Sequence, residues 1–157
     1  MHVTVTGASG HIGNNLVRYL LQKNFTVRAV YRTATKHFIF KGLDTEHRTG
    51  DILDYAFVED ICKATDIVIH LAAVISIDGD PTGIVHRTNT IGVKNVVEAC
   101  RKMGVRKLIH FSSIHAFNVN NYSDCIDENC VASDSSCMAY DFSKAEGEKE
   151  IIRAIQE

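Results

Sequence analysis

Short apolar segments rich in β-branched residues alternate along this chain with longer segments of helical periodicity. Four apolar segments are clear and one is weaker, namely His2–Thr6, Thr26–Tyr31, Asp66–Leu71, Lys107–Ser112 and the weaker Glu46–Thr49. Their lengths and compositions are typical of strands. Strands that alternate with helices predict βαβ units and a parallel sheet, and therefore an α/β fold.

Three helices are predicted from the remaining apolar positions. They run from a glycine-rich loop to about Asn24, over Asn89–Met103 and over Tyr140–Gln156. The first helix places Ile12, Leu16 and Leu20 on one stripe, which we expect to be buried. The second is expected to stop at Gly104, because glycine readily adopts the left-handed conformation that ends a helix.

Length and composition fit a single domain, 1–157, with 45% hydrophobic residues to form its core. The 17 Lys and Arg nearly balance the 19 Asp and Glu, so nucleic acid is not an expected partner. Apolar stretches such as Ile67–Ile75 are much shorter than the roughly 20 residues that span a bilayer. The N-terminus also lacks a signal-peptide pattern. We therefore expect no membrane partner and a cytoplasmic location.

The cysteines and histidines follow no metal-binding spacing. Five cysteines form no CxxC pair, which favours free thiols over a disulfide framework or a zinc site, and they are Cys62, Cys100, Cys125, Cys130 and Cys137. The eight histidines are equally scattered. No metal site is predicted.

A glycine-rich loop, TGASGHIG, follows the first predicted strand and opens the first predicted helix. Glycine lets the backbone N–H groups approach a diphosphate closely, and a helix N-terminus attracts the negative charge. The loop therefore predicts a dinucleotide site. The cofactor-binding residues expected in it are Gly7, Ser9, Gly10, His11, Ile12 and Gly13.

The end of the second strand bears on the choice between NAD and NADP. An acidic residue there would bind the ribose hydroxyls, whereas an arginine would pair with a 2′-phosphate. The sequence has no acid at this point, and Arg32 lies 19 residues beyond Gly13. Arg32 therefore predicts NADP as the cofactor, with Lys36 adding charge. An arginine that is merely exposed at a strand end is the alternative, and NAD then becomes the cofactor.

Tyr140, Lys144 and Ser113 are candidates for acid/base chemistry. Reduction of a carbonyl needs a proton donor beside its oxygen, and Tyr140 is such a group. A phenol ionises near pH ~10, and a neighbouring positive charge is the usual means of bringing this towards neutrality. Lys144, one helical turn onward, supplies such a charge. Ser113, after an apolar strand, is placed to orient the substrate oxygen.

The glycine-rich loop, the Ser112-Ser113 pair and Tyr140-x-x-x-Lys144 together resemble the extended short-chain dehydrogenase/reductase family, over essentially the whole chain. The resemblance implies a Rossmann-type, doubly wound parallel sheet in three α/β/α layers. It also implies a catalytic Ser-Tyr-Lys set, which here is Ser113, Tyr140 and Lys144. Members usually continue into a C-terminal substrate lobe that these 157 residues lack, so we expect the NAD(P)-binding part of a longer enzyme.

Further positions match cofactor contacts of that family. Asp51 and Ile52 resemble its adenine-contacting pair, and Asn89 resembles a helix asparagine that supports the site. The other expected contacts are Leu71, Ala72, Ala73, Ser112, Tyr140 and Lys144, the lysine through the nicotinamide ribose. Alternatives stay open, because Asp51 and Asn89 are also suitable helix caps. The segment 71–73 also fits strand core, and Ser112 also fits the role of Ser113.

The predicted function is NADP-dependent hydride transfer to or from a carbonyl or secondary alcohol of a small molecule. The first alternative is an NAD-dependent sugar-nucleotide epimerase or dehydratase, although Phe117 stands where many sugar-nucleotide members carry tyrosine. The second is a nonenzymatic dinucleotide-sensing module. His115 either faces substrate or is a loop residue in contact with water. The polar stretch 114–139 is interpreted as active-site wall.

Related proteins often dimerise through the two helices that match Asn89–Met103 and Tyr140–Gln156. Each helix keeps apolar residues beyond one buried face, such as Ile91 and Phe142. A homodimer through these helices is therefore predicted. Light scattering that shows a strict monomer at high protein concentration would contradict it.

Overall fold

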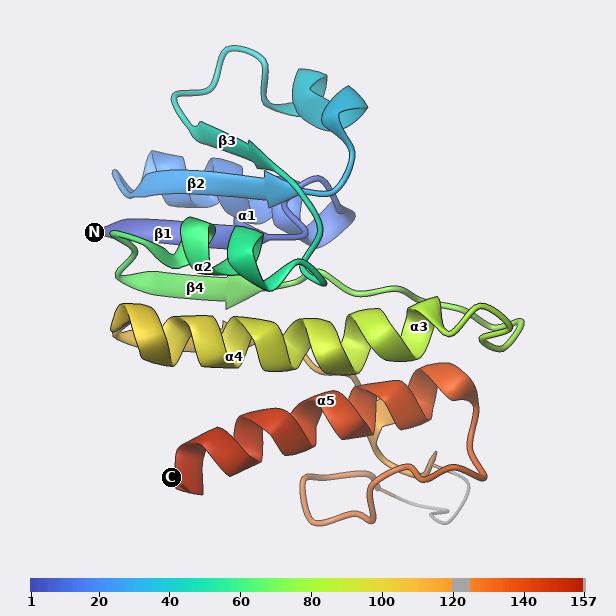
Figure 1. The fold of residues 1–157 in the computed structure, drawn as a ribbon. Coiled ribbons are helices and arrows are strands. Elements are labelled where there is room, and N and C mark those ends of the chain that lie inside the picture. The colour runs from blue at the N-terminus through green and yellow to red at the C-terminus, as the bar shows by residue number, and fades with distance from the viewer. Residues whose placement is uncertain (120–124, 157) are drawn as a thin grey trace. The chain divides into compact units, whose positions relative to one another are not determined.

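The computed structural model describes residues 1–119 and 125–156, and in them five strands form one parallel sheet. The strands are β1 (His2–Thr6), β2 (Thr26–Tyr31), β3 (Glu46–Thr49), β4 (Ile67–His70) and β5 (Lys107–His110). Their order is β3-β2-β1-β4-β5 (Figure 1). This is the order of a Rossmann-type sheet, which confirms the predicted fold class. β4 and β5 are shorter than predicted. Leu71 and Phe111, the residues that follow them, each donate only one last backbone hydrogen bond to the neighbouring strand.

Two compact units can be distinguished along the chain. The first comprises Met1–Ala72 and Asn95–Phe111, and the second comprises Ala73–Lys94 and Ser112–Glu157. The first unit contains the whole sheet. The second contains the helical turns and the long C-terminal helix.

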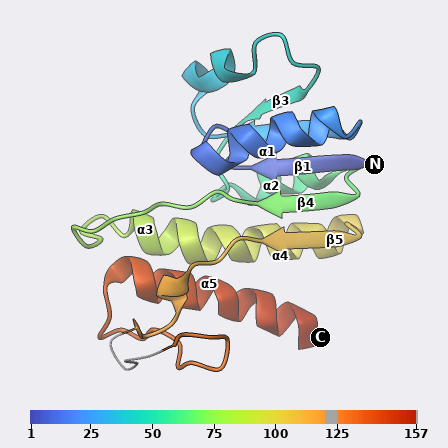
Figure 2. The same cartoon turned by 180° about the vertical axis from the view of Figure 1, so that it is seen from behind.

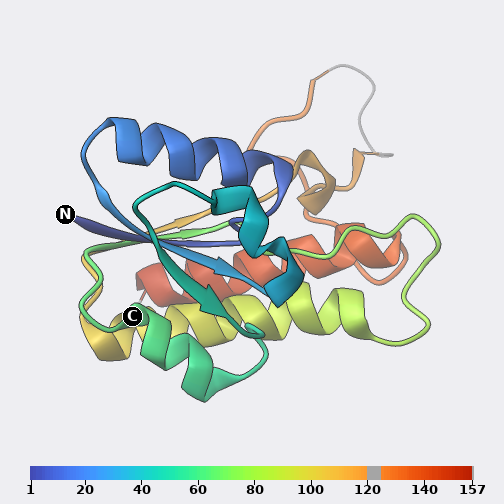
Figure 3. The ribbon, with the colours of Figure 1, turned by 90° about the horizontal axis from the view of Figure 1, so that it is seen from above.

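In the first unit, helices cover both faces of the sheet. Helix α1 (His11–Gln22) packs on one face, and α2 (Tyr55–Cys62) lies on the other with α4 (Gly92–Met103) (Figures 2 and 3). A 3₁₀ segment, η1 (Ala34–Phe40), follows β2. These are the three predicted layers. α4 ends where expected, at Gly104 with φ +69°.

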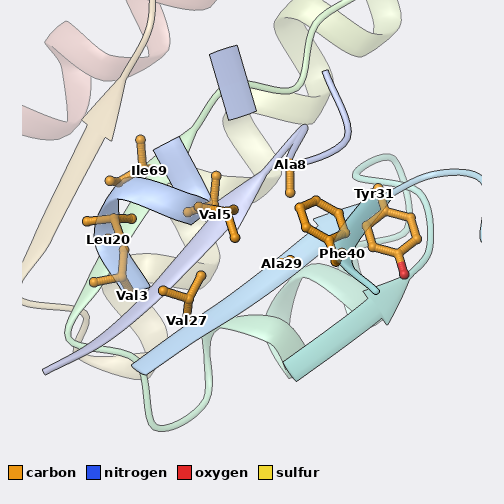
Figure 4. Close-up of a cluster of buried hydrophobic side chains, with 10 residues drawn as sticks. Val3, Val5, Ala8, Leu20, Val27, Ala29, Tyr31, Phe40 and Ile69 are labelled. Carbon is orange, nitrogen blue, oxygen red and sulfur yellow. The ribbon is translucent and has the colours of Figure 1, made fainter. Parts of the chain in front are cut away.

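Each face of the sheet has its own apolar cluster, as parallel strands with helices on both sides require. The cluster that includes residues of α1 is drawn in Figure 4 and consists of Val3, Val5, Ala8, Val17, Leu20, Val27, Ala29, Tyr31, Phe40 and Ile69. The cluster under α2 and α4 consists of Val30, Ile52, Val58, Ile61, Cys62, Val68, Val96, Ala99 and Cys100. All five cysteines of the chain are free thiols, as predicted.

The predicted buried stripe of α1 is wrong at Ile12, whose side chain is 54% exposed. The buried residues of this helix are Gly13, Val17 and Leu20. The reason lies at the start of the helix, where Gly13 packs against the backbone of the glycine loop. That contact turns the neighbouring Ile12 outward, and Leu16 is only partly buried.

Arg28 ties the middle of β2 to its neighbours. Its side chain is buried, and its Nε donates to Glu46 Oε2 at 2.9 Å. Its Nη1 donates to the carbonyl oxygens of Ile61 and Lys63 and to Thr65 Oγ1, at 2.6, 2.9 and 3.1 Å. A buried cation needs such partners, since an unpaired one would be costly. The network joins β2, β3 and the segment after α2.

The second unit begins its helical structure earlier than predicted. α3 (Ile84–His86) continues through a π-helical turn, η2 (Arg87–Ile91), into α4. The start is fixed by Asp80, whose carboxylate accepts the amide protons of Val85 and His86 at 3.0 and 2.8 Å. The prediction of a helix beginning at Asn89 is therefore wrong. The unit also contains the short η3 (Ile114–Ala116) and the long α5 (Ala139–Gln156).

The Arg28–Glu46 contact predicts a pH-dependent contribution to stability. Burial raises the pKa of the Glu46 carboxyl, but the hydrogen bonds and charges of Arg28 and Arg48 outweigh it, and the pKa lies below the ordinary 4.5. A lowered pKa stabilises the fold above pH 4.5, and this is lost as the pH falls through the lowered value. Glu46→Gln should therefore cost most above pH 4.5. Urea denaturation at stepped pH measures this, and a constant difference would contradict it.

Candidate functional site

The glycine-rich loop is closed by backbone contacts that leave no room for side chains. Gly7 has φ +67°, and a Cβ there would lie 2.7 Å from the backbone nitrogen of Ala72. A Cβ on Gly13 would lie 2.4 Å from the carbonyl oxygen of Gly7 and 2.7 Å from Ala8 Cα. Close packing of the backbone against itself is therefore one reason for glycine at these two positions, and the approach of the loop to a diphosphate stays a prediction.

The N-terminus of α1 is suited to an anion. Its capping residue is Gly10, no side chain caps the helix, and no acidic residue stands in its first turn. The first N–H groups of a helix lack partners within the helix and attract negative charge. The loop and the start of α1 thus fit the diphosphate of a dinucleotide.

Thr6 is a residue of this region that the sequence reasoning missed. Its Oγ1 lies 2.7 Å from Nδ1 of the buried His70. The same oxygen accepts from the amides of Leu71 and Ala72, each at 3.3 Å. Thr6 therefore fixes the segment that leaves β4, to which two of the predicted cofactor contacts belong. Its place at the carboxyl end of β1, directly before Gly7, is the signal that could have found it.

Arg32 and Asp51 both follow strands of the first unit. Arg32 comes directly after β2, is exposed, and makes no hydrogen bond or ion pair to any residue that the structure describes. Asp51 closes a turn, where its Oδ1 accepts from the amide of Leu53 at 2.9 Å. The alternative of Asp51 as a helix cap is wrong, because Asp54 caps α2. Ile52, the other predicted adenine contact, is buried in the core.

In the second unit, the predicted catalytic residues lie on η3 and α5. Ser113 caps η3, and its Oγ accepts from the amide of His115 at 3.2 Å, which leaves its own proton to donate. Tyr140 and Lys144 are one turn apart on α5. Lys144 is only 4% exposed. Burial lowers the pKa of its ammonium group, and the charge of Glu148 opposes this. Ser112 is exposed beside Ser113.

Asn89 joins the π-helical turn to the segment after β4 and to α5. Its side chain is 1% exposed, donates to the Val74 carbonyl oxygen at 2.8 Å and accepts from the Val74 amide at 2.9 Å. It also donates to Ser143 Oγ at 3.0 Å, and Ser143 in turn donates to the Tyr140 carbonyl oxygen at 2.6 Å. Asn89 is therefore not a helix cap but a residue that holds the turn of Tyr140 in place. Ser143 was missed by the sequence reasoning.

Only part of the predicted active-site wall, 114–139, can be followed, because residues 120–124 lie outside the described ones. In the described part, Phe117 pairs with Ala132 in an isolated bridge. The amide of Ser133 donates to the Ala116 carbonyl oxygen at 2.8 Å. The wall is thus tied to η3 on its C-terminal side.

Among the described residues, no helix combines the length and apolar character needed to cross a membrane.

Comparison with known proteins adds to this geometry. The model of the NAD dependent epimerase/dehydratase family matches residues 3–157. The chain belongs to this family. A family relative named sterol demethylase protein B, from Methylococcus capsulatus, is 33% identical over 153 residues, which are 97% of this chain and 46% of that protein. A putative dihydroflavonol 4-reductase from Synechocystis is 28% identical over 98% of this chain and 45% of its own length. The chain spans a little under half of these relatives.

Solved structures of epimerases and related proteins share the fold. A UDP-glucose 4-epimerase from Thermotoga maritima, solved with UDP-glucose, matches with a TM-score of 0.88 and 25% identity, over 100% of this chain and 52% of that one. MoeE5 in complex with UDP-glucose and NAD matches with a TM-score of 0.86 and 23% identity, over 100% and 50% of the two chains. The predicted resemblance to the extended short-chain dehydrogenase/reductases is confirmed at the level of the epimerase/dehydratase family.

The bonds of Asn89 predict that this residue stabilises the second unit. Asn89→Ala would leave the Val74 amide and carbonyl and the Ser143 hydroxyl without these partners. The free energy of unfolding should fall by at least about 1–3 kcal/mol, the cost of one buried polar group left unpaired. Urea denaturation measures the loss, and hydrogen exchange at the Val74 amide should accelerate. Asn15→Ala, which removes an exposed side-chain bond on α1, is the control. Equal stability of Asn89→Ala and the unaltered chain would contradict the role.

Proposed function

We propose that this chain is the cofactor-binding part of an NADP-dependent oxidoreductase that acts on a carbonyl or secondary alcohol of a small molecule. The observation that carries the proposal is the end of β2, where an exposed arginine without a described partner stands in place of an acid. A guanidinium is well suited to bind a phosphate through two parallel hydrogen bonds. Arg32 thereby favours a cofactor with a 2′-phosphate over NAD.

The residues of the first unit fit the remaining parts of such a cofactor. The loop from Gly7 to Gly13 and the uncapped start of α1 would hold the diphosphate. Asp51 and Ile52 would lie along the adenine, and Leu71 and Ala72, fixed by Thr6, along the nicotinamide half. When bound, a nicotinamide cofactor supplies or accepts a hydride.

The residues of the second unit would handle the proton. Tyr140 donates it to the substrate oxygen in reduction and accepts it in oxidation. Ser113, whose hydroxyl proton is left to donate, orients that oxygen. The buried ammonium group of Lys144, one turn along α5, adds positive charge on the same helix and binds the cofactor ribose. Asn89 and Ser143 hold the first turn of α5.

Two other functions are alternatives to the NADP-dependent oxidoreductase. The similarity to a UDP-glucose 4-epimerase favours an epimerase or dehydratase that uses NAD, which would need no phosphate site at Arg32. Phe117 disfavours this alternative within the predicted family pattern. The second alternative is a dinucleotide sensor, which would bind the cofactor without turnover. The presence of both Tyr140 and Lys144 favours an enzyme.

We also propose that the chain forms a homodimer through the helices that contain Asn89–Met103 and Tyr140–Gln156. Ile91 of η2 is 44% exposed, which leaves an apolar surface next to α4. Near the end of α5, Ile152 and Ile155 are 51% and 79% exposed. Phe142 offers less exposed apolar surface than predicted, because it is partly buried and stacks on His86.

NADPH should bind this chain more tightly than NADH. Arg32→Ala should weaken NADPH by about 1.5–3 kcal/mol, the contribution of a charged hydrogen bond, and leave NADH unchanged. Titration calorimetry with both cofactors measures this. Arg106→Ala is the matched control, since Arg106 is exposed before β5 at the opposite edge of the sheet and should affect neither cofactor. Equal affinities, or tighter NADH, would refute the role of Arg32 and favour the NAD-dependent alternative.

Tyr140→Phe should abolish most turnover while NADPH binding persists. The expected loss in kcat is about 10²–10⁴-fold, the usual contribution of a positioned proton donor. The measurement is NADPH oxidation with a panel of small aldehydes and ketones, beside a binding titration. Tyr19→Phe removes a phenol that is exposed on α1 and serves as the control. Turnover that Tyr140→Phe leaves unchanged would contradict the role of Tyr140 as proton donor.

A further inference from the structure

Arg18 of α1 is bonded to η1, the segment that follows Arg32 and Thr33. Its Nη2 donates to the Ile39 carbonyl oxygen at 2.7 Å, and its Nε donates to Asn14 Oδ1 at 3.1 Å. A guanidinium is planar, so two bonds from different nitrogens fix its orientation. Both bonds lie at the surface, so neither is needed to satisfy a polar group of the core. All of these residues belong to the first unit.

Another side of η1 packs on the sheet through aromatic rings. In a 3₁₀-helix, residues three positions apart lie on the same side, which places His37 and Phe40 together. The buried Phe40 stacks on Tyr31 of β2, with 5.7 Å between ring centroids (Figure 4). The ring of His37 lies 4.3 Å, between centroids, from that of His47 in β3. η1 is thus held between the sheet and α1.

Lys36 lies on a side of η1 that is not used for this packing. It is three residues after Thr33, and its amide donates to the Thr33 carbonyl oxygen at 3.0 Å. This turn brings Lys36 over Thr33, the residue that directly follows Arg32. Arg32, Thr33 and Lys36 are all exposed. The turn therefore places a second cation near Arg32, which suits one group with two negative charges.

The chain around this turn carries charge of one sign only. Residues 1–43 contain no Asp or Glu, and their six Lys and Arg are Arg18, Lys23, Arg28, Arg32, Lys36 and Lys41. Among the residues that the structure describes, only the buried Arg28 of these six has a carboxylate partner, Glu46. Like charges repel each other, so Lys36 stays near Arg32 only if η1 is held by fixed contacts.

We propose that Arg18 is a positioning residue that determines the choice of cofactor. By holding η1, it keeps Lys36 near Arg32, so that both cations bind the same 2′-phosphate. Without Arg18 the phosphate would meet Arg32 alone. The inference rests on the proposed function, because Arg32 is taken to bind the 2′-phosphate of the cofactor.

The test is the ratio of the affinities of the 157-residue chain for NADPH and NADH, measured by titration calorimetry. Arg18→Gln should lower this ratio about fivefold, the effect of one net hydrogen bond lost between Lys36 and the phosphate. NADH should bind as before, since it has no 2′-phosphate. Lys36→Gln alone should lower the ratio by the same factor. The double variant should fall no further, because both changes remove the same contact.

Three variants separate position from charge. Lys23→Gln removes the same charge from α1, where Lys23 lies over the Tyr19 ring and not on η1, and should keep the ratio. Arg18→Lys keeps the charge but cannot make both bonds of the guanidinium, and should lower the ratio. Asn14→Ala removes one of these bonds without a change in charge, and should lower it by a smaller factor.

Three results would overturn the inference and leave the proposed function standing, because the unaltered chain still prefers NADPH in each. They are an equal loss of both cofactors in Arg18→Gln, a fall in the ratio that Lys23→Gln reproduces, and additive effects of Arg18→Gln and Lys36→Gln. An equal loss would show a role in the fold alone. If the unaltered chain binds NADH as tightly as NADPH, Arg32 binds no phosphate, and both the inference and the NADP-dependent function fail.

Discussion

The contact of Gly13 with the backbone of Gly7 and Ala8 determines much of the first unit. The three residues approach so closely that any side chain on Gly13 would overlap the loop. This contact sets the rotation of α1 about its axis, and therefore which residues of the helix pack on the sheet. It also keeps the loop short and its N–H groups close together at the start of α1. One backbone contact thus links the apolar core to the proposed diphosphate site.

The second unit likewise depends on a few contacts around Asn89. Its single amide group bonds the segment after β4 and, through Ser143, the first turn of α5. Gly147 allows this proximity, since a Cβ there would lie 2.4 Å from the Asn89 carbonyl oxygen. The proposed proton donor, Tyr140, is therefore held by its helix backbone, and its side chain stays free for chemistry.

The sequence predicts the sheet well, because buried strands alternating with helices leave a strong periodic signal. Three candidate motifs are also visible, since they depend on residue types at short spacings, and they are the glycine-rich loop, the Ser112-Ser113 pair and Tyr140-x-x-x-Lys144. The predictions that fail concern positions where a nearby residue takes the expected role. Asp54 and not Asp51 caps α2, and Asp80 fixes a helix start five residues before Asn89. The pairing of His115 with Asp141 joins residues 26 positions apart across a polar stretch. No local pattern encodes such a contact.

The π-helical turn at Arg87–Ile91 has a consequence for how this segment tolerates changes in length. A π turn holds one residue more than an α-helical turn, and such turns are frequent at functional sites. Removing one residue would let the helix close into a regular α-helix. The helix on the two sides of the deletion would keep nearly the same relative rotation, because the π turn already accommodates the extra residue, but the side chains within the turn would point in new directions. The amide of Asn89 would face away from Val74 or from Ser143, so the number of residues in this turn is as much a requirement as their identity.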